Sequence, residues 1–536
     1  MCGFFGALGK DKVNLEKYKF HSYRGPDDYN EIYLFDSINK NFAINHSRLE
    51  IIGDKIAGKQ PVINNNLCFV FNGEIFGQEL IDYKNSDTLF LFNKFEETIK
   101  DNNKLKLNSF LNSLNGFFAI AILDRINNQI LLIRDRYGQK PLYYAKKCQK
   151  FCFGSCIKDI RNYLDINIKT NKVNIRRGGG FIYDELNPVD SSYIKQVAPG
   201  EIVRYKDGKI QHEFWSEIDN KNLYKGENYS EYLERLDYLL DDAVKIRCHS
   251  PSKIALSLSG GYDSSLIATY ASKYKPDLQA FTLSVNDEKF NEVSRAKLIS
   301  EKLNIPLIVA KEQNTNYVQY KKLSRVLEIP AFNPSFTGYD DFYSNLTGKY
   351  KVILEGHGAD EIFGGYPVNH IEYLYYLVKN FRLNEASKTF QISKKSFGTS
   401  SFGIYKSLLG RLLISLFKGK KQTPESLIKS FFKEYSLPSN LRVFDRLTLY
   451  NNLEHRCPFL DRRIVELAQS TPSNILFHGG LPKAPICDLL KQKGLYYNAK
   501  KIGFTSSFKL KFLSSKNNNL SRSNVMKNYF KNIEQL

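Results

Sequence analysis

Seven residues near the middle of the chain, Ser259–Ser265, constrain its fold more than any other segment. They read Ser-Gly-Gly-Tyr-Asp-Ser-Ser, and apolar runs at 254–258 and 266–268 flank them. This order predicts a strand, a tight turn and a helix. The glycines let the backbone approach an anion closely, while the serines and the helix N-terminal amides donate hydrogen bonds to it. The segment therefore predicts a nucleotide-phosphate cradle in which Asp263 holds a magnesium ion against the pyrophosphate.

The start of the chain carries a second chemical signal, Met1-Cys2-Gly3. Removal of the initiator methionine would leave a thiol and a free α-amine on Cys2. A residue of this kind is an N-terminal nucleophile that carries its own base. The two signals lie one in each half of the chain, which indicates two separate sites.

Length and composition indicate a folded protein of two domains. The chain has 536 residues, more than one hydrophobic core usually serves. Its hydrophobic content of 42% and charged content of 25% exclude a disordered or fibrous protein. The net charge of +21 would suit a nucleic-acid partner, but lysine is spread along the whole chain and no nucleic-acid module is recognisable. We therefore expect no nucleic-acid partner.

The lack of a recognisable targeting signal and the distribution of the cysteines favour a reducing compartment. No apolar run approaches the roughly 18 residues that span a bilayer, and the N-terminus lacks a signal-peptide pattern. The eight cysteines are scattered, and Cys2 must stay reduced to act as a nucleophile. Cys148, Cys152 and Cys156 are interpreted as structural residues, since 151–155 reads as a strand and no CxxC pair accompanies them. We expect a cytoplasmic protein.

The pattern of apolar runs divides the chain into two parts. Residues 2–208 read as short β-segments separated by Gly, Asn and Asp, which suits an antiparallel sandwich. A polar linker is expected at 209–228. From 229 to 536, short apolar runs alternate with helical segments, which predicts a parallel sheet covered by helices, with its ligand at the carboxyl ends of the strands.

Two later segments carry expectations of their own. Residues 404–421 form a basic amphipathic stretch, which we interpret as a buried helix in preference to a membrane contact. The C-terminus is rich in Ser, Asn and Lys and is expected to be poorly ordered.

Several motifs follow one another in a recognisable order. They are Met1-Cys2-Gly3, Tyr23-Arg-Gly-Pro-Asp-Asp28, His46-Ser-Arg-Leu49, Phe71-Asn-Gly-Glu-Ile75, Ser86-Asp-Thr88, Arg134-Asp-Arg-Tyr-Gly-Gln-Lys-Pro-Leu142 and the central cradle. With these motifs the whole chain resembles the glutamine-hydrolysing asparagine synthetase family, and its first half resembles the class II glutamine amidotransferases. The resemblance implies an α+β first half, an N-terminal-nucleophile type of antiparallel β-sandwich with helices. It implies an α/β second half, a parallel-sheet PP-loop domain with a helical extension.

For the first half, the resemblance implies glutamine hydrolysis. Cys2 would attack the side-chain carboxamide of glutamine while its α-amine accepts and returns a proton. The oxyanion would be held by the Asn72 side chain and the Gly73 backbone N–H. The other residues implied to bind glutamine are Arg48 for the α-carboxylate, Asp87 for the α-ammonium group, and Glu74.

For the second half, the resemblance implies that ATP activates a carboxylate as its acyl-adenylate, and that ammonia arriving through an internal tunnel displaces AMP. Asp263 and Asp360 are the implied magnesium ligands. The family acceptor is aspartate, and a homodimer is plausible. The residues implied to bind ATP are Leu258, Ser259, Gly260, Gly261, Asp263, Ser264, Ser265, Leu283, Glu355, Gly356 and Lys483.

Two departures from the family pattern bear on the acceptor. His357 stands where the family usually has a glutamate thought to deprotonate the incoming nitrogen. An imidazole could act as that base, could hydrogen-bond the acceptor, or could be structural. In addition, 331–338 contains Phe332 and Phe336 in place of an Arg and a Ser-Thr-Pro run.

These departures leave three hypotheses open. Aspartate follows from the family. A larger or less charged acceptor, such as the uronic acid of a surface polysaccharide, follows from the altered residues. A homologue that binds glutamine or nucleotide without synthesis is the third, and the retention of Cys2, Asp263, Asp360 and Lys483 speaks against it.

Overall fold

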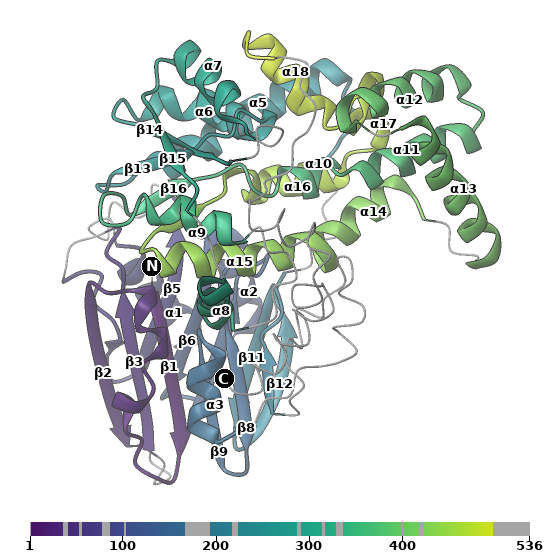
Figure 1. Cartoon of the computed structure of the whole chain (residues 1–536). Coiled ribbons are helices and arrows are strands. Elements are labelled where there is room, and N and C mark those ends of the chain that lie inside the picture. The colour runs from purple at the N-terminus through teal and green to yellow at the C-terminus, as the bar shows by residue number, and fades with distance from the viewer. Residues whose placement is uncertain are drawn as a thin grey trace.

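The first half of the chain folds into two six-stranded antiparallel sheets (Figure 1). The computed structural model describes residues 2–35, 41–52, 56–77, 86–100, 103–166, 193–216, 223–286, 291–313, 317–328, 336–398, 400–418 and 422–496. The first sheet has the order β10-β8-β9-β1-β3-β2, and the second has the order β12-β11-β7-β6-β5-β4. The strands are β1 (Cys2–Gly9), β2 (Asp28–Phe35), β3 (Asn41–Arg48), β4 (Val62–Ile63), β5 (Leu67–Ile75), β6 (Gly116–Asp124), β7 (Gln129–Arg134), β8 (Tyr143–Lys147), β9 (Lys150–Gly154), β10 (Ile194–Gln196), β11 (Glu201–Lys206) and β12 (Lys209–Phe214).

Apolar side chains fill the space between these two sheets. Phe4 and Ile44 from the first sheet meet Val70 and Leu132 from the second in one buried cluster. Helices α1 (Asp87–Lys100) and α2 (Lys104–Ser113) cover the outer face of the second sheet, and α3 (Ile157–Leu164) covers the outer face of the first. The predicted antiparallel sandwich with helices is confirmed. Residues 209–214, which were expected to begin the linker, instead form β12 and pair with β11.

The second half contains a five-stranded parallel sheet with the order β15-β14-β13-β16-β17. The apolar runs that predicted strands form β13 (Ile254–Ser257), β14 (Gln279–Ser284), β15 (Leu307–Lys311) and β16 (Val352–Leu354). Helices α5 (Tyr229–Cys248), α6 (Tyr262–Tyr274) and α7 (Val293–Leu303) pack on one face. Helices α8 (Tyr317–Leu327), α9 (Phe336–Ser344) and α15 (Ser436–Tyr450) pack on the other. The predicted parallel sheet covered by helices is confirmed.

The fifth strand, β17 (Glu454–Arg456), was not expected. It is wholly buried, yet its residues, Glu-His-Arg, are all polar. It therefore lacks the apolar run by which a buried strand is recognised in a sequence. It pairs with β16 in parallel, with Leu354 opposite Arg456. Its polar side chains are available for contacts at the site described below.

The described part of the second half contains further helices. They include α10 (Ala359–Phe363), α11 (Pro367–Lys379), α12 (Leu383–Phe397), α13 (Ser401–Lys418), α14 (Pro424–Ser430), α16 (Arg462–Ser470), α17 (Ser473–Leu476) and α18 (Ala484–Gln492). Of these, α11, α12 and α13 lie at the right of Figure 1.

The amphipathic stretch predicted at 404–421 lies mostly in α13. Ile404 is buried and Arg411 forms an ion pair with Glu372 of α11, whereas Tyr405 and Leu409 are exposed. The expected buried helix is thus only partly buried over its described side chains. Within the described residues, no helix combines the length and the hydropathy of a membrane span. The expected disorder of the C-terminus concerns residues outside those described.

Buried ion pairs join the two halves where α15 lies over the antiparallel sheets (Figure 1). Arg24 Nη2 lies 2.8 Å from Asp445 Oδ2, and Lys140 Nζ lies 3.0 Å from Asp445 Oδ1 and 3.3 Å from Glu454 Oε1. These four side chains are almost completely buried. Burial alone would raise the pKa of Asp445, but the charges of Arg24 and Lys140 lower it. Asp445 is therefore ionised at neutral pH and holds two cations of the first half.

We predict that Asp445→Asn destabilises the protein by about 3–5 kcal/mol, because Arg24 would lose the buried carboxylate that compensates its charge. Urea denaturation measures the change. Glu385→Gln is the matched control, since Glu385 pairs with Arg382 on the surface and its loss should change stability by less than about 1 kcal/mol. Equal losses in the two variants would show that the buried contact has no special role.

Candidate functional site

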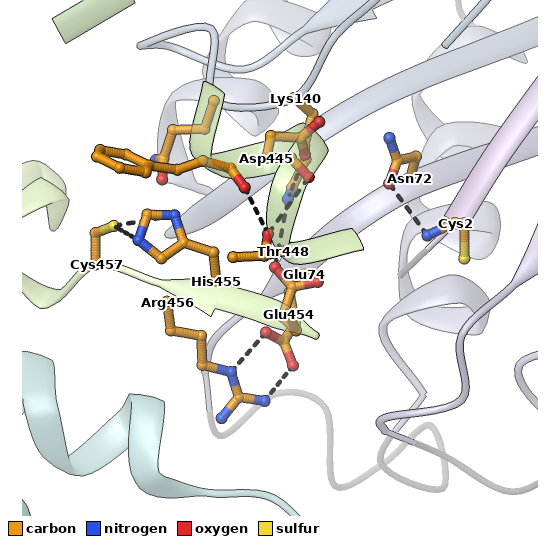
Figure 2. A network of polar contacts seen from close by, with 12 residues as sticks. Cys2, Asn72, Glu74, Lys140, Asp445, Thr448, Glu454, His455, Arg456 and Cys457 are labelled. Carbon is orange, nitrogen blue, oxygen red and sulfur yellow. Dashed lines mark hydrogen bonds and ion pairs between the residues drawn. The ribbon is translucent and has the colours of Figure 1, made fainter. Parts of the chain in front are cut away.

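Cys2 begins β1 and faces Asn72 of β5. The Cys2 N–H donates to Asn72 Oδ1 at 3.3 Å (Figure 2). The Cys2 carbonyl accepts a hydrogen bond from Arg24 Nε at 3.2 Å. Within the described residues, the buried Asn72 Nδ2 has no hydrogen-bond partner. It is therefore available to donate to an anion that forms beside Cys2.

Gly73 must be glycine for a steric reason. A Cβ at this position would collide with the backbone carbonyl oxygen of Phe117 on the neighbouring strand β6. The β5 backbone therefore lies close against β6 at the residue after Asn72. This close packing holds the strand in place next to Cys2.

Arg48, Gly73, Glu74 and Asp87, four of the five expected glutamine-binding residues, line one pocket. The fifth, Asn72, contacts Cys2, which also lines it. Asp87 begins α1 and accepts a hydrogen bond from the Ile75 N–H at 3.4 Å. The pKa of Asp87 is raised to about 7, mainly by burial and secondly by the nearby charge of Glu74. The residues that line the pocket are Cys2, Arg48, Leu49, Ile51, Ile52, Gln60, Phe71, Gly73, Glu74, Asp87 and Thr88.

Glu74 also connects this pocket to the parallel sheet. Its carboxylate forms a bidentate ion pair with Arg456 of β17, in which Arg456 Nε lies 2.8 Å from Glu74 Oε2 (Figure 2). Arg456 Nη1 also donates to the carbonyls of Arg247 and His249. The charge of Glu74 is therefore balanced by the second half of the chain.

The predicted cradle joins β13 to α6, as the residue pattern indicated. Ser259 Oγ accepts the Gly261 N–H at 3.1 Å and lies 3.0 Å from Ser264 Oγ. Gly260 has φ +72°, and a Cβ there would lie 2.5 Å from Arg295 Cβ. Within the described residues, the buried Ser265 Oγ has no partner. The turn is thus tight, with hydroxyls and amides gathered at the start of α6.

Asp263 and Asp360 converge on Lys483. Lys483 Nζ lies 2.7 Å and 2.6 Å from the two Asp263 oxygens and 2.8 Å from Asp360 Oδ1. Burial would lower the pKa of Lys483, but the two carboxylates raise it. The residues therefore form a charged cluster beside the cradle, where two carboxylates from α6 and α10 share one cation.

Three of the residues implied to bind ATP, Leu258, Leu283 and Gly356, lie at the ends of β13, β14 and β16. Leu258 is buried and its N–H donates to the Phe281 carbonyl at 2.8 Å, and Leu283 is buried in β14. A Cβ on Gly356 would lie 3.0 Å from Asp263 Cβ, so this loop packs directly against the start of α6.

Glu355 and His357 follow β16 and contact residues of β17 and its neighbours. Glu355 Oε2 accepts a hydrogen bond from the Tyr343 hydroxyl at 2.9 Å and lies 2.9 Å from His455 Nε2 and 3.4 Å from His357 Nδ1. The His357 ring stacks on Phe444 with centroids 3.7 Å apart. Burial would raise the pKa of Glu355, but the two histidines lower it.

The residues singled out at 331–338 are only partly described. Phe332 lies outside the described residues. Phe336 is buried in the apolar cluster that contains Phe281 and Leu283. Its environment is that of a core residue.

The sequence reasoning missed five residues, four of which contact charged partners that lie far from them in the chain. The one available signal was the spacing of His455 and Cys457, because residues two apart share a face of a strand. The missed residues are Arg24, Lys140, His455, Arg456 and Cys457.

Comparisons with known proteins agree with this arrangement. The asparagine synthase family profile matches residues 235–521, and the glutamine amidotransferase domain profile matches residues 1–216. Asparagine synthetase [glutamine-hydrolyzing] 2 of Bacillus subtilis is 26% identical over 89% of this chain and 67% of its own length. Asparagine synthetase [glutamine-hydrolyzing] 3 of the same organism is 25% identical over 90% and 83%.

A solved structure, a glutamine phosphoribosylpyrophosphate amidotransferase of B. subtilis, matches at 15% identity with a TM-score of 0.30. The match covers 66% of this chain and 75% of that one. At this score the superposition adds nothing to the fold, which rests on the sheet topology.

We predict that Gly73→Ala forces β5 away from β6, because the new Cβ cannot fit beside the Phe117 carbonyl. Amide hydrogen exchange over 71–75 and 116–119 should accelerate, and the protein should lose stability by more than the about 1–2 kcal/mol that a left-handed alanine alone costs. Gly208→Ala is the control, since it has φ +74° with nothing near its Cβ. Unchanged exchange over β5 in Gly73→Ala would contradict the steric argument.

Proposed function

This chain belongs to the asparagine synthase family, and from that premise we propose that it is an ATP-dependent ligase that takes nitrogen from glutamine and forms an amide on an acceptor carboxylate. One observation carries the proposal: a single chain holds both a pocket around Cys2 and a phosphate cradle bordered by Asp263, Asp360 and Lys483. The glutaminase half corresponds to residues 2–208 extended by β12, and the ATP-using half to 229–536. The family also supports a homodimer, which the mass of the protein in solution tests.

In the first half, Cys2 acts as the nucleophile. Its thiolate attacks the glutamine carboxamide, and its α-amine passes the thiol proton to the departing ammonia. Water then hydrolyses the thioester to glutamate. Asn72 Nδ2 and the Gly73 N–H stabilise the oxyanion in both steps. Asn72 Nδ2 supports this assignment, because a buried donor that finds no partner among the described residues suits a charge that appears only during the reaction.

Arg48 and Asp87 bind the two ends of the amino acid. Arg48 lines the pocket and is suited to the α-carboxylate of glutamine. Asp87 is suited to the α-ammonium group. Because Glu74 is engaged by Arg456, we assign it the task of fixing the pocket wall rather than that of a direct ligand.

In the second half, the cradle serines and amides bind the phosphates of ATP. The two carboxylates that meet at Lys483 are the oxygen donors that magnesium prefers, so Asp263 and Asp360 fit this ion, which would neutralise phosphate charge. The acceptor carboxylate attacks the α-phosphorus and releases pyrophosphate. Ammonia then attacks the acyl-adenylate and releases AMP. Lys483 stabilises the negative charge of the phosphates.

The family favours aspartate as the acceptor, which would make asparagine. A uronic acid is the second candidate, because 331–338 lacks the Arg and the Ser-Thr-Pro run that suit a small dicarboxylic amino acid. A role for His357 as the base that deprotonates ammonia fits either acceptor.

The deciding experiment supplies ATP, Mg²⁺ and glutamine with either aspartate or a nucleotide-linked uronic acid. It measures pyrophosphate release and the mass of the amide product. We expect release to depend on the acceptor. Asparagine would establish the family reaction, a uronamide would establish the second candidate, and no release with either acceptor would favour a homologue that binds without synthesis.

We predict that Cys2→Ala abolishes amide formation from glutamine but leaves amide formation from added ammonium salt. Asn72→Ala should lower the rate of glutamine hydrolysis by about 10²–10³, because one oxyanion donor is lost. Steady-state rates with each nitrogen source make the measurement. Loss of the ammonia-dependent reaction in both variants would mean that these residues act on folding or on the second half instead.

We also predict that glutamine binds more tightly as pH rises toward about 7. The raised pKa of Asp87 means that its carboxyl is protonated below pH about 7, and only the ionised form attracts an ammonium group. Calorimetry on Cys2→Ala avoids hydrolysis and should show affinity falling about tenfold per pH unit below this value. Asp87→Asn should bind weakly at every pH. The same pH dependence in Asp87→Asn would assign the titration to another group.

A further inference from the structure

Two neighbouring strands of the parallel sheet end in side chains that bind metals. Glu355 and His357 follow β16, while His455 lies in β17 and Cys457 follows it. In each pair the residues are two apart, and the strands are joined there by the Glu355 N–H, which donates to the Arg456 carbonyl at 3.1 Å. Because the strands are parallel, all four side chains gather at one edge of the sheet. None of these contacts involves the acidic cluster at Lys483.

The polar atoms of this group lie at distances close to those between ligands of one metal ion. His357 Nδ1 lies 3.1 Å from His455 Nε2, which lies 3.1 Å from Cys457 Sγ. One ligand atom from each of these three residues lies within 4.8 Å of the others. Tetrahedral zinc, with bonds of about 2.0–2.3 Å, holds its nitrogen and sulfur ligands about 3.3–3.6 Å apart. Small outward movements of the side chains would therefore admit the ion.

The contacts around His455 Nε2 exceed what hydrogen bonding allows. This one nitrogen lies within 3.1 Å of His357 Nδ1 and Cys457 Sγ, and within 2.9 Å of Glu355 Oε2. A neutral imidazole nitrogen either donates one proton or accepts one hydrogen bond, so it cannot satisfy three partners at once. Figure 2 shows the short His455–Cys457 contact. A cation bound between the two imidazoles and the thiol would give each of these groups a ligand bond, so that they would no longer compete for one nitrogen.

We propose that His357 Nδ1, His455 Nε2 and Cys457 Sγ form a binding site for a zinc-class divalent ion. The carboxylate of Glu355 lies beside these ligands, and its negative charge would attract the cation. Imidazole and thiolate ligands suit zinc, whereas magnesium prefers oxygen. Cys457 binds as the thiolate and releases its proton to solvent as the ion enters. Three protein ligands leave one coordination position for water or another small molecule, which is the pattern of catalytic zinc sites.

This site differs from the magnesium site assigned to Asp263 and Asp360 and does not depend on the proposed reaction. It is an alternative to the role of His357 as a base, because an imidazole bound to a metal through Nδ1 keeps its proton on Nε2. The two are nevertheless neighbours, because Gly356, between Glu355 and His357, packs within 3.0–3.1 Å of Asp263 and Ser264. His357 is a quarter exposed, whereas Glu355, His455 and Cys457 are almost completely buried. His357 supplies the second nitrogen ligand of this set. The glutamate that the family usually has at this position would offer an oxygen ligand instead.

The test measures zinc bound to the full-length protein without an affinity tag. The protein is loaded with zinc, dialysed against metal-free buffer, and analysed by mass spectrometry for metal content. We expect about one zinc per chain in the wild type. Cys457→Ser should lose it, and His357→Gln, a change at a partly exposed position, should weaken zinc binding by at least about tenfold. Cys248→Ser, which replaces a buried cysteine of α5, is the matched control and should retain the metal.

Cobalt substitution identifies the ligands even if a variant folds poorly. The wild-type cobalt complex should show a thiolate-to-cobalt charge-transfer band and the strong visible bands of four-coordinate cobalt. The band should persist in Cys248→Ser and in Cys2→Ala. No bound zinc in the wild type, a cobalt spectrum without the thiolate band, or a thiolate band that persists in Cys457→Ser would overturn the proposal. All these readouts are made without substrates, so they are separate from a failure of the proposed reaction.

Discussion

The rest of the structure depends on charges that are buried between the two halves. A charged group away from water is stable only beside a partner, so Arg24 and Lys140 require Asp445, and Arg456 requires Glu74. Glu74 lies two residues after Asn72 in β5, and Arg456 lies in β17. Their pairing therefore holds the pocket around Cys2 at a fixed place relative to the parallel sheet. Any sliding of one half over the other would separate buried opposite charges.

The parallel sheet gathers the remaining chemistry at one edge. The cradle follows β13, and the Glu355 and His357 pair follows β16, next to β17. Parallel strands all end at the same edge, so groups far apart in the chain meet there without special loops. The edge offers two different donor sets, oxygen atoms from Asp263 and Asp360 and nitrogen and sulfur atoms around His455. They would select different ions for this chemical reason.

Much of the fold could be predicted because its strands carry periodic or continuous apolar runs. The runs at 67–71, 117–123 and 254–258 all became strands, and the cradle lies between β13 and α6 as its glycines and serines indicated. β17 could not be predicted, since its three buried residues are polar and resemble a loop. β12 fell within the range expected to be a linker, and only two of its six residues, Ile210 and Phe214, are apolar. Trp215 beside it is nevertheless buried.

The sequence by itself determined the tight turn of small residues at 259–265 and the order of motifs that marks the family, and it predicted a nucleophile at Cys2. Only the tertiary structure decided which groups meet. Glu74 and Arg456 are 382 residues apart, and His357 and His455 are 98 apart. No local pattern specifies such partners, because a buried charge or ligand is paired by whichever strand or helix the fold brings beside it. Secondary-structure propensity and hydrophobic periodicity depend on residues that are close in the sequence, whereas burial depends on contacts between distant segments of the chain.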